Sequence, residues 1–300
     1  MKNKVLIIGL GKIGFNYDIK KKYLIHSHAK ALMLNNNFVL IGAVEKKYEI
    51  RKIFEKKFNL PTYNNLEKAF SVLNPSLVII SSPTSTHLKV FEELVKIQKK
   101  KKIVKNVVIE KPVGANFNQT NKILKLAKKN KIKIFVNYIR QYQRDLLSLF
   151  NFVKIKNFKY SEVHYNKGLR NNASHFICLM ISFFGNIQQI KLLKKDLKNP
   201  SFKIKFKKNE CFFYSKKKKK NICDIWFKKK ENQIGLINNS KIIFKKLNNK
   251  IIKKKRTNMN KYQKNVYESI FNNLKKNKKI LINDKIVLNT SKVIDKIENL

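Results

Sequence analysis

The sequence is poor in glycine, proline and cysteine, and it has no long apolar run. Of its 300 residues, 8 are glycine, 5 are proline and 3 are cysteine. Cys178, Cys211 and Cys223 form no CxxC pair, which argues against a disulfide framework or a zinc site and favours a reducing compartment. No run approaches the roughly 18 apolar residues that a membrane helix needs. We therefore expect a cytoplasmic protein with no membrane contact and no bound metal.

The first residues have a basic beginning and a short apolar run, as an export signal does. Gly9 and Gly11 interrupt that run, and no small-residue cleavage site follows it. We therefore assign the start of the chain to the first strand of the fold and not to a targeting segment.

Arginine and acidic residues are also scarce, whereas lysine is abundant. The chain has 68 lysines and arginines against 18 acidic residues, for a formal net charge of +50, yet only five of the 68 are arginine. Arginine is the residue that binds phosphate and guanine bidentately, and the lysines are spread along the whole chain. The excess of lysine, asparagine, isoleucine and phenylalanine is typical of an A/T-biased genome. We favour this bias over a dedicated nucleic-acid-binding role, which remains an alternative based on charge.

Short β-branched runs alternate with longer amphipathic segments in the first half of the chain. This alternation is typical of a doubly wound parallel sheet with crossover helices, the Rossmann arrangement. We predict strands at residues 4–8, 38–44, 77–81, 107–109 and 133–137. We predict helices at residues 28–35, 46–58, 66–73, 87–99 and 119–130.

The pattern changes after residue 138, where polar and apolar residues alternate along several segments. The predicted strands are 158–165, 188–193, 202–206, 210–214, 222–227 and 242–247. The predicted helices are 144–152, 174–184, 262–274 and 289–296. This order favours an α+β domain with a mostly antiparallel sheet covered by helices on one face. We therefore expect a dinucleotide-binding domain at 1–138 and a substrate-binding and oligomerisation domain at 139–300.

A run of five lysines, residues 216–220, lies between two predicted strands. We interpret it as a solvated hairpin loop, because blocks of like charge are often exposed turns. A polybasic contact site is the alternative interpretation.

The segment GLGKIG follows the first predicted strand directly. It fits the dinucleotide fingerprint, in which Gly9 permits a tight turn, Gly11 lets the backbone approach a pyrophosphate, and Gly14 lets helix and strand pack closely. Lys12 and Ile13 complete this candidate cofactor turn. The pattern alone is weak, but its position after a strand strengthens it.

Glu45 ends the second predicted strand, where a carboxylate can accept hydrogen bonds from the adenosine ribose. It lies 31 residues beyond Gly14, farther than the usual interval of about 20. We attribute the excess to an insertion around residues 17–25. NAD is the favoured cofactor, although Lys46 and Lys47 leave NADP possible. An ordinary solvated acid is the alternative for Glu45.

Two further segments lie at the ends of predicted strands: SSPTSTH at 81–87 closes one, and EKPVG at 110–114 follows the strand VVI. Together with the glycine turn, they resemble the Gfo/Idh/MocA family of oxidoreductases, which includes glucose-fructose oxidoreductase and inositol dehydrogenase. The resemblance continues through VNYIRQY at 136–142, YNKGLRNNASH at 165–175 and DKIVLNTSKVIDKI at 284–297, so it covers nearly the whole chain. The motifs are specific only in combination.

The resemblance implies a nicotinamide-dependent oxidoreductase that acts on a sugar, a polyol or a nucleotide sugar, with homo-oligomers as its usual state. It implies that the SSPTSTH segment lies along the cofactor. The cofactor contacts implied there and at the EKP motif are Ser82, Pro83, Thr84, His87, Glu110 and Lys111.

Lys111 follows an apolar predicted strand, at the carboxyl edge where open parallel sheets bind ligands. A cationic nitrogen there can stabilise negative charge on a substrate oxygen. Pro112 fixes the adjacent backbone and can adopt the cis form. A structural lysine at the strand end is the alternative.

The resemblance makes His175 the proton-transfer partner, and an imidazole that titrates near neutrality suits this role. A histidine that serves only at the helix start is the alternative. His26, His28 and His164 are weaker candidates, and His87 is placed with the cofactor wall.

The remaining candidates are contacts for a polyol or sugar substrate. They are Tyr138, Arg140, Tyr165, Lys167, Asn171, Asn172 and His175. Many family members carry aspartates where this chain has Asn171 and Cys178, and asparagine cannot tune a neighbouring base through charge. A catalytically impaired dinucleotide-binding or regulatory protein is therefore the alternative to an active enzyme.

Overall fold

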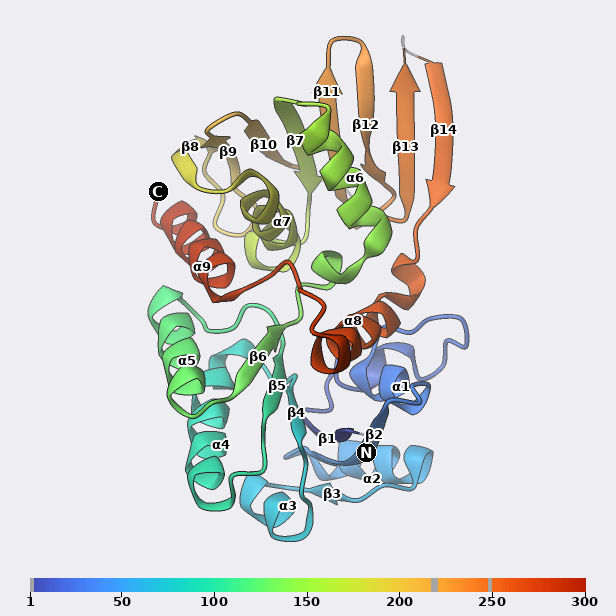
Figure 1. The fold of residues 1–300 in the computed structure, drawn as a ribbon, viewed down its shortest axis with the longest axis vertical. Coiled ribbons are helices and arrows are strands. Elements are labelled where there is room, and N and C mark those ends of the chain that lie inside the picture. The colour runs from blue at the N-terminus through green and yellow to red at the C-terminus, as the bar shows by residue number, and fades with distance from the viewer. Residues whose placement is uncertain (1–2, 217–220, 248–249) are drawn as a thin grey trace. The chain divides into compact units, whose positions relative to one another are not determined.

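The computed structural model describes residues 3–216, 221–247 and 250–300, and these fold into two compact units. The first unit comprises Met1–Tyr138 and Lys261–Ile280, and the second comprises Ile139–Asn260 and Leu281–Leu300. The chain thus passes from the first unit to the second, returns for one helix, and ends in the second (Figure 1).

The first unit is built on a six-stranded parallel sheet with the order β3-β2-β1-β4-β5-β6. β4 and β5 are buried at every residue, as expected for parallel strands that are covered on both faces. The five predicted strands are confirmed to within one residue at each end, and the two-residue β3 was not predicted. The strands are β1 (Asn3–Ile8), β2 (Phe38–Val44), β3 (Thr62–Tyr63), β4 (Leu77–Ile80), β5 (Asn106–Ile109) and β6 (Lys133–Val136).

Five helices join these strands, and each agrees with its prediction to within two residues at either end. Their apolar faces pack on the sheet, and asparagine side chains cap the first turns of α3 and α5. α4 contacts α3 and α5, as Figure 1 shows. The helices are α1 (His28–Met33), α2 (Tyr48–Phe58), α3 (Leu66–Val72), α4 (His87–Lys101) and α5 (Phe117–Lys129).

The predicted insertion interrupts the first helix of the sheet. The amide of His28 donates to the carbonyl of Ile13, and the amide of Ala29 donates to the carbonyl of Gly14, at 2.9 and 3.0 Å. An α-helical hydrogen bond spans four residues, whereas these two hydrogen bonds span fifteen. Eleven residues are therefore inserted between the first turn of the helix and its continuation. Subtracting eleven from the interval of 31 between Gly14 and Glu45 leaves 20, the usual spacing of a dinucleotide site.

The inserted loop is held by one buried carboxylate. Asp18 is 1% exposed, and it accepts hydrogen bonds from the amides of His26 and Ser27 at 2.6 and 3.0 Å. The hydroxyl of Ser27 donates to the same carboxylate at 2.6 Å. These bonds place Ser27 where its side chain caps α1, so the helix resumes in register.

Helix α8 (Tyr262–Lys276) completes the first unit, although it follows the second unit in the chain. It packs on α1. The ring of Tyr262 stacks on His26 at 4.4 Å between centroids, and the amide of Gln263 donates to the carbonyl of Ile25. The sequence analysis grouped this helix with the second domain. In the structure, its contacts with α1 and the inserted loop belong to the first unit.

The second unit contains an eight-stranded sheet with the order β14-β13-β12-β11-β7-β10-β9-β8. Every neighbouring pair is antiparallel except β10 and β7, so the expected mostly antiparallel α+β class is confirmed. β12 and β14 were not predicted. The strands are β7 (Tyr160–Tyr165), β8 (Ile187–Lys194), β9 (Ser201–Phe206), β10 (Glu210–Ser215), β11 (Cys223–Lys229), β12 (Asn232–Ile237), β13 (Ile242–Leu247) and β14 (Lys250–Arg256).

The expected hairpin around the lysine run is wrong. β10 and β11 lie on opposite sides of β7, and each pairs with β7 instead of with the other. β10 and β11 therefore do not form a two-stranded hairpin. Residues 217–220 of the run lie outside the described part of the chain, so neither reading of its lysines is tested.

Three helices cover one face of the second sheet, as Figure 1 shows. They are α6 (Arg144–Ile155), α7 (Ser174–Phe184) and α9 (Asp284–Glu298). α7 lies between the other two and contacts both, and its side chains are nearly all buried. The core of this unit is formed by α7 with the inward side chains of the sheet. Among the described residues, no helix is both long and apolar enough to span a membrane.

The anchor of the inserted loop gives a testable stability prediction. Asp18→Ala leaves two buried amides and a hydroxyl without their acceptor, so we expect the free energy of unfolding to fall by about 3 kcal/mol. Asp18→Asn keeps one acceptor oxygen and should lose less. Urea unfolding followed by circular dichroism measures both, with the exposed Glu231→Ala as control. A loss in Asp18→Ala no larger than in this control would contradict the anchoring role.

Candidate functional site

The glycine turn joins β1 to the first helical turn at the carboxyl edge of the sheet. Gly9 has a φ of +92°, a value that L side chains rarely adopt. A Cβ on Gly14 would lie 2.1 Å from the carbonyl oxygen of Gly9, so this position requires glycine for the close approach of turn and helix. Ser81, after β4, donates its hydroxyl to the carbonyl of Gly9 at 2.8 Å, which ties the turn to the neighbouring strand.

Gly11 differs from the other two glycines of the turn. A Cβ built on Gly11 meets no atom within 4 Å, and Gly11 and Lys12 are both exposed. The turn thus offers open space in front of its backbone, where a pyrophosphate can approach. The residues present fit a dinucleotide in this respect.

Glu45 connects the end of β2 to the glycine turn. Its carboxylate accepts a hydrogen bond from the amide of Leu10 at 2.8 Å and one from the amide of Lys47 at 3.1 Å. Arg51 donates to the carbonyls of Glu45 and Lys46, both at 2.9 Å. Glu45 is therefore not an ordinary solvated acid. It lies at the strand end where ribose hydroxyls bind in this fold.

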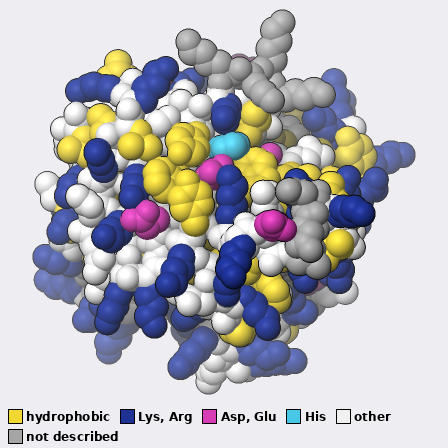
Figure 2. Space-filling model, turned by 90° about the horizontal axis from the view of Figure 1, so that it is seen from above, with side chains coloured by type: hydrophobic (Ala, Val, Ile, Leu, Met, Phe, Trp, Pro, Cys, Tyr) yellow, Lys and Arg dark blue, Asp and Glu magenta, His cyan; other side chains and the backbone are white. Residues whose placement is uncertain are grey.

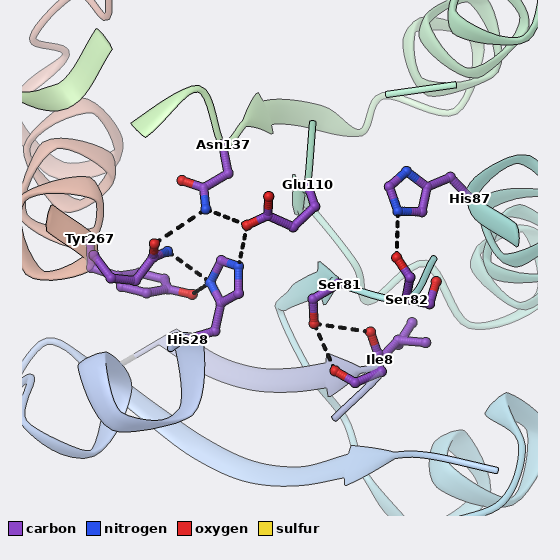
Figure 3. Close-up of polar contacts among 10 residues, drawn as sticks. Ile8, His28, Ser81, Ser82, His87, Glu110, Asn137 and Tyr267 are labelled. Carbon is purple, nitrogen blue, oxygen red and sulfur yellow. Dashed lines mark hydrogen bonds and ion pairs between the residues drawn. The ribbon is translucent and has the colours of Figure 1, made fainter. Parts of the chain in front are cut away.

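His87 contacts the segment after β4 through Ser82 (Figure 3), and the segment after β5 through Val113. Its Nε2 lies 2.9 Å from the carbonyl oxygen of Ser82, and its Nδ1 lies 3.1 Å from that of Val113. A neutral imidazole has one N–H and can donate to only one of two carbonyls. Burial nevertheless lowers the pKa of His87, because the loss of hydration outweighs the carbonyl hydrogen bonds. The ring is fully buried and is held neutral between the two segments.

Lys111 comes two residues after the end of β5, and β5 neighbours β4 in the sheet. It is half-buried, as a few other lysines are, and among the described residues no lysine is fully buried. The peptide bond between Lys111 and Pro112 is cis, as the sequence analysis allowed. The lysine thus lies at the carboxyl edge of the same sheet as the glycine turn.

A buried polar cluster surrounds Glu110, the residue before Lys111 (Figure 3). His28 Nε2 lies 3.0 Å from Glu110 Oε1, and Asn137 Nδ2 donates to the same oxygen at 2.5 Å. Asn137 also donates to Gln263 Oε1 at 3.2 Å. His28 Nδ1 lies 2.8 Å from Gln263 Nε2 and 2.7 Å from the hydroxyl of Tyr267. These five residues come from four separate parts of the first unit.

The pKa of Glu110 reflects a competition between burial and this cluster. Burial raises the pKa, but the hydrogen bonds of His28 and Asn137 and the charge of Lys111 together bring it below its usual range. Burial and the charge of Glu110 also raise the pKa of the Tyr267 phenol well above its usual value. Glu110 is therefore ionised at neutral pH, and Tyr267 keeps its proton. The sequence analysis ranked His28 low and did not single out Asn137, Gln263 or Tyr267.

His175 lies in the second unit, near the start of α7, and is 5% exposed. A π-helical turn, Leu169–Ala173, precedes the helix and carries Asn171 and Asn172. π-turns are frequent at functional sites. Cys178 lies one turn beyond His175 and accepts a hydrogen bond from Gln141 at 3.3 Å. Burial raises the pKa of its thiol to about 12, so this sulfur carries no charge that could replace a carboxylate.

Of the predicted substrate contacts in the second unit, three are engaged within it. Arg140 is 4% exposed, donates to Ser240 at 3.1 Å and lies over the ring of Phe176. Tyr165 is fully buried and donates its hydroxyl to the carbonyl of Pro200.

Asn172 donates to Asn221 and to the carbonyl of Ile222, both at 2.9 Å. Lys167 and Asn171 are exposed. Tyr138 belongs to the first unit and is buried. Lys167 and Asn171 are therefore the solvent-exposed members of this predicted set.

The strand order 3-2-1-4-5-6, with a glycine turn after the first strand and an acid after the second, defines a dinucleotide-binding protein of the Rossmann class. Residues 3–138 match a family model described as "Oxidoreductase family, NAD-binding Rossmann fold". Residues 3–138 are thus similar to the nucleotide-binding domain of the Gfo/Idh/MocA oxidoreductases, which supports an NAD(P)-dependent oxidoreductase. The expected resemblance, fold class and cofactor are thus confirmed.

Solved structures of low sequence identity share the fold over the whole chain. A dehydrogenase from Clostridium difficile is 16% identical, with a TM-score of 0.77 over 100% of this chain and 99% of that chain. UDP-N-acetylglucosamine 3-dehydrogenase from Acidithiobacillus ferrooxidans is 10% identical, with a TM-score of 0.78 over 100% and 97%. A 3-ketoreductase from Actinomadura kijaniata, solved with TDP-benzene and NADP, is 9% identical, with a TM-score of 0.77 over 100% and 98%. No curated protein sequence matches the chain.

The lowered pKa of His87 predicts a pH-dependent stability. As pH falls below about 6.5, the unfolded chain binds a proton at this histidine that the folded chain does not, so acidification favours unfolding. Between pH 7 and pH 5, the free energy of unfolding should therefore fall less in His87→Gln than in the parent. The difference in slope is at most about 1.4 kcal/mol per pH unit in the range where the histidine titrates. Urea unfolding at a series of pH values measures the difference. Equal slopes in parent and variant would show that His87 is not held neutral.

Proposed function

We propose that this oxidoreductase transfers a hydride between nicotinamide and a carbinol or carbonyl carbon of a sugar, polyol or nucleotide sugar. Lys111 polarises the substrate oxygen, and His175 acts as general acid and base. The observation that carries the proposal is the place of Lys111, half-buried at the carboxyl edge of β5 in the sheet that also carries the glycine turn. Open α/β sheets bind their ligands at this edge.

The proposed reaction follows from the chemistry of these two side chains. When bound, the cofactor supplies a nicotinamide ring that accepts or donates the hydride. In oxidation, His175 removes the hydroxyl proton as the C–H bond breaks and the C=O bond forms. Lys111 donates a hydrogen bond to that oxygen and stabilises the negative charge on it. In reduction, the same groups act in reverse, and His175 returns the proton.

The cofactor contacts that we propose lie along the carboxyl edge of the first sheet. The pyrophosphate would lie against the glycine turn, formed by Gly9, Gly11, Lys12, Ile13 and Gly14. The Glu45 carboxylate would accept hydrogen bonds from the ribose hydroxyls. Because Glu45 is a carboxylate, it disfavours a 2′-phosphate, so we propose NAD as the preferred form. The remaining proposed contacts are Ser82, Pro83, Thr84, His87, Glu110 and Lys111.

The substrate class rests on the names of two structural neighbours and on the polar residues of the second unit. The 3-dehydrogenase acts on a nucleotide sugar by its name, and the 3-ketoreductase was solved with TDP-benzene and NADP; we propose a sugar, polyol or nucleotide-sugar substrate here. Lys167 and Asn171 offer an exposed cation and amide for hydroxyl or phosphate groups. Tyr138, Arg140, Tyr165 and Asn172 would then support the substrate region through packing and internal hydrogen bonds.

We also propose that the chain forms a homo-oligomer through the second sheet. The face opposite the helices carries half-buried aromatic side chains, including Tyr160, Phe212, Tyr214 and Trp226. Apolar surface of this kind marks interaction sites. A cytoplasmic location fits the three buried free thiols.

The positive charge does not add a nucleic-acid role to this proposal. On the face shown in Figure 2, lysine and arginine side chains lie scattered among polar and apolar ones instead of forming a single patch. A dispersed charge of this kind suits solubility better than the recognition of one polyanion.

Cofactor binding is tested by a pair of glycine variants. Gly11→Ala places a methyl group in open space, so the fold should keep its melting temperature while NADH affinity falls about tenfold or more because the methyl group blocks the pyrophosphate. Gly14→Ala forces a contact of 2.1 Å with backbone and should lower the melting temperature itself. Calorimetric titration with NADH and with NADPH in moderate salt measures affinity. Unchanged NADH affinity in Gly11→Ala would reject this turn as the pyrophosphate site.

Catalysis is tested by turnover in a screen of inositol, glucose, UDP-glucose and UDP-N-acetylglucosamine with NAD and NADP. We expect Lys111→Ala and His175→Ala each to lower kcat by about 100-fold or more, with little change in NADH affinity. The exposed Lys133→Ala is the matched lysine control. Full turnover in Lys111→Ala would reject its role. Cofactor binding without turnover of any substrate in the parent would favour the impaired, regulatory alternative that Asn171 and Cys178 suggest.

A further inference from the structure

The buried cluster around Glu110 fixes which nitrogen of His28 carries the proton. Glu110 is a carboxylate and can only accept, so Asn137 must turn its NH2 group toward Oε1. The second hydrogen of that NH2 group points at Gln263 Oε1. Gln263 must then turn its own NH2 group toward His28 Nδ1. Nδ1 is therefore an acceptor, and the proton of a neutral imidazole lies on Nε2.

In this tautomer, His28 is a hydrogen-bond donor to Glu110. Its Nε2–H donates to Glu110 Oε1, the oxygen that Asn137 also binds. Two donors on one oxygen restrict the carboxylate to one orientation. The side chain of Glu110 is 14% exposed and that of His28 is fully buried, so solvent screens the pair only weakly. The next residue in the chain is Lys111, the proposed catalytic group.

We propose that His28 is a positioning residue for Lys111. Locked by α8 into the tautomer that donates from Nε2, it keeps Glu110 as a fixed, ionised carboxylate beside the lysine. The catalytic importance of this arrangement rests on the function proposed above, whereas the state of Glu110 does not. Through Gln263 and Tyr267, the helix that returns from the second unit takes part in setting the charge next to Lys111.

The charged and titratable groups around Glu110 come from several elements. They are His28 from α1, Tyr267 from α8, His87 from α4 and the neighbouring Lys111. Tyr267 keeps its proton and His87 is neutral, so neither neutralises the carboxylate. If His28 no longer donates, only the hydrogen bond of Asn137 and the charge of Lys111 still stabilise the ionised form of Glu110 against the effect of burial. The carboxyl group then takes up a proton at higher pH than in the parent.

The direct test follows Glu110 by NMR with glutamate labelled at its carboxyl carbon, assigned with Glu110→Gln, in the NADH-free full chain. In the parent, we expect no titration of Glu110 between pH 5 and pH 9. In His28→Met, its proton affinity should rise about a hundredfold or more, because burial then acts against the charge with less compensation. His28→Gln offers an amide donor near the position of Nε2 and should restore part of the parent behaviour. If His28→Met does not fold, Gln263→Met, which removes the donor to Nδ1, takes its place.

The second readout is the reactivity of Lys111 toward acetic anhydride, followed by peptide mass spectrometry relative to Lys133. When Glu110 is protonated, Lys111 loses a neighbouring negative charge and its amine is free more often. Labelling in His28→Met should therefore exceed that in the parent several-fold at pH 6 and match it at pH 9, where Glu110 is ionised again. Glu110→Gln should label faster at both pH values.

An unchanged Glu110 titration in a folded His28→Met would overturn the proposal. So would an unchanged Lys111 reactivity in the presence of a shifted Glu110, because His28 would then act on the carboxylate alone. Failure of the proposed function is a separate result. It would be seen as full turnover in Lys111→Ala, whereas the two readouts of His28 need no substrate.

Discussion

The pairing of the Glu110 carboxylate is the constraint on which the first unit depends. Placing a charge at the covered end of a parallel strand costs several kcal/mol unless hydrogen bonds and opposite charges offset it. The chain meets this cost with side chains that are far apart in sequence, His28 after the insertion, Asn137 after β6 and Gln263 on α8. Because Gln263 and Tyr267 come from a segment beyond the second unit, the nucleotide-binding sheet reaches its final polar arrangement only when the chain has returned.

Most of the fold was predictable because its elements are local patterns. The buried parallel strands are continuous β-branched runs, such as LVII in β4, and their helices have clear apolar faces. The two missed strands of the second sheet lack such a signal. β14 has the sequence KIIKKKR and is exposed at every residue, so no alternation between core and solvent marks it. β12 carries Gly235, and a Cβ at this position would lie 2.0 Å from the carbonyl oxygen of Ile225. The backbones of β11 and β12 approach closely there, and this close approach leaves no side-chain alternation that would mark the strand in the sequence.

The candidate site was predictable to the extent that it consists of strand ends. The glycine turn, Glu45 and the EKP segment each follow a strand that the sequence displays. The insertion was also anticipated, but its length of eleven residues emerged only from the amide bonds that His28 and Ala29 make to Ile13 and Gly14. Without that register, His28 was only a weak candidate at the start of a predicted helix. The partners of His28 on α8 are 235 and 239 residues away, a distance over which no periodicity in one sequence carries information.

Lysine abundance makes this chain a demanding case for separating chemistry from composition. A biased composition substitutes lysine where water can solvate it, and among the described residues no lysine is fully buried. The polar interior of the first unit uses aspartate, glutamate, histidine, asparagine, glutamine and tyrosine, side chains whose donors and acceptors have to match their partners. Lys111 lies between these two environments, the solvated surface of the other lysines and the polar interior of the first unit. It is half-buried and directly follows a carboxylate that His28 and Asn137 hold by hydrogen bonds and that Gln263 and Tyr267 support through His28, so composition alone does not account for its surroundings.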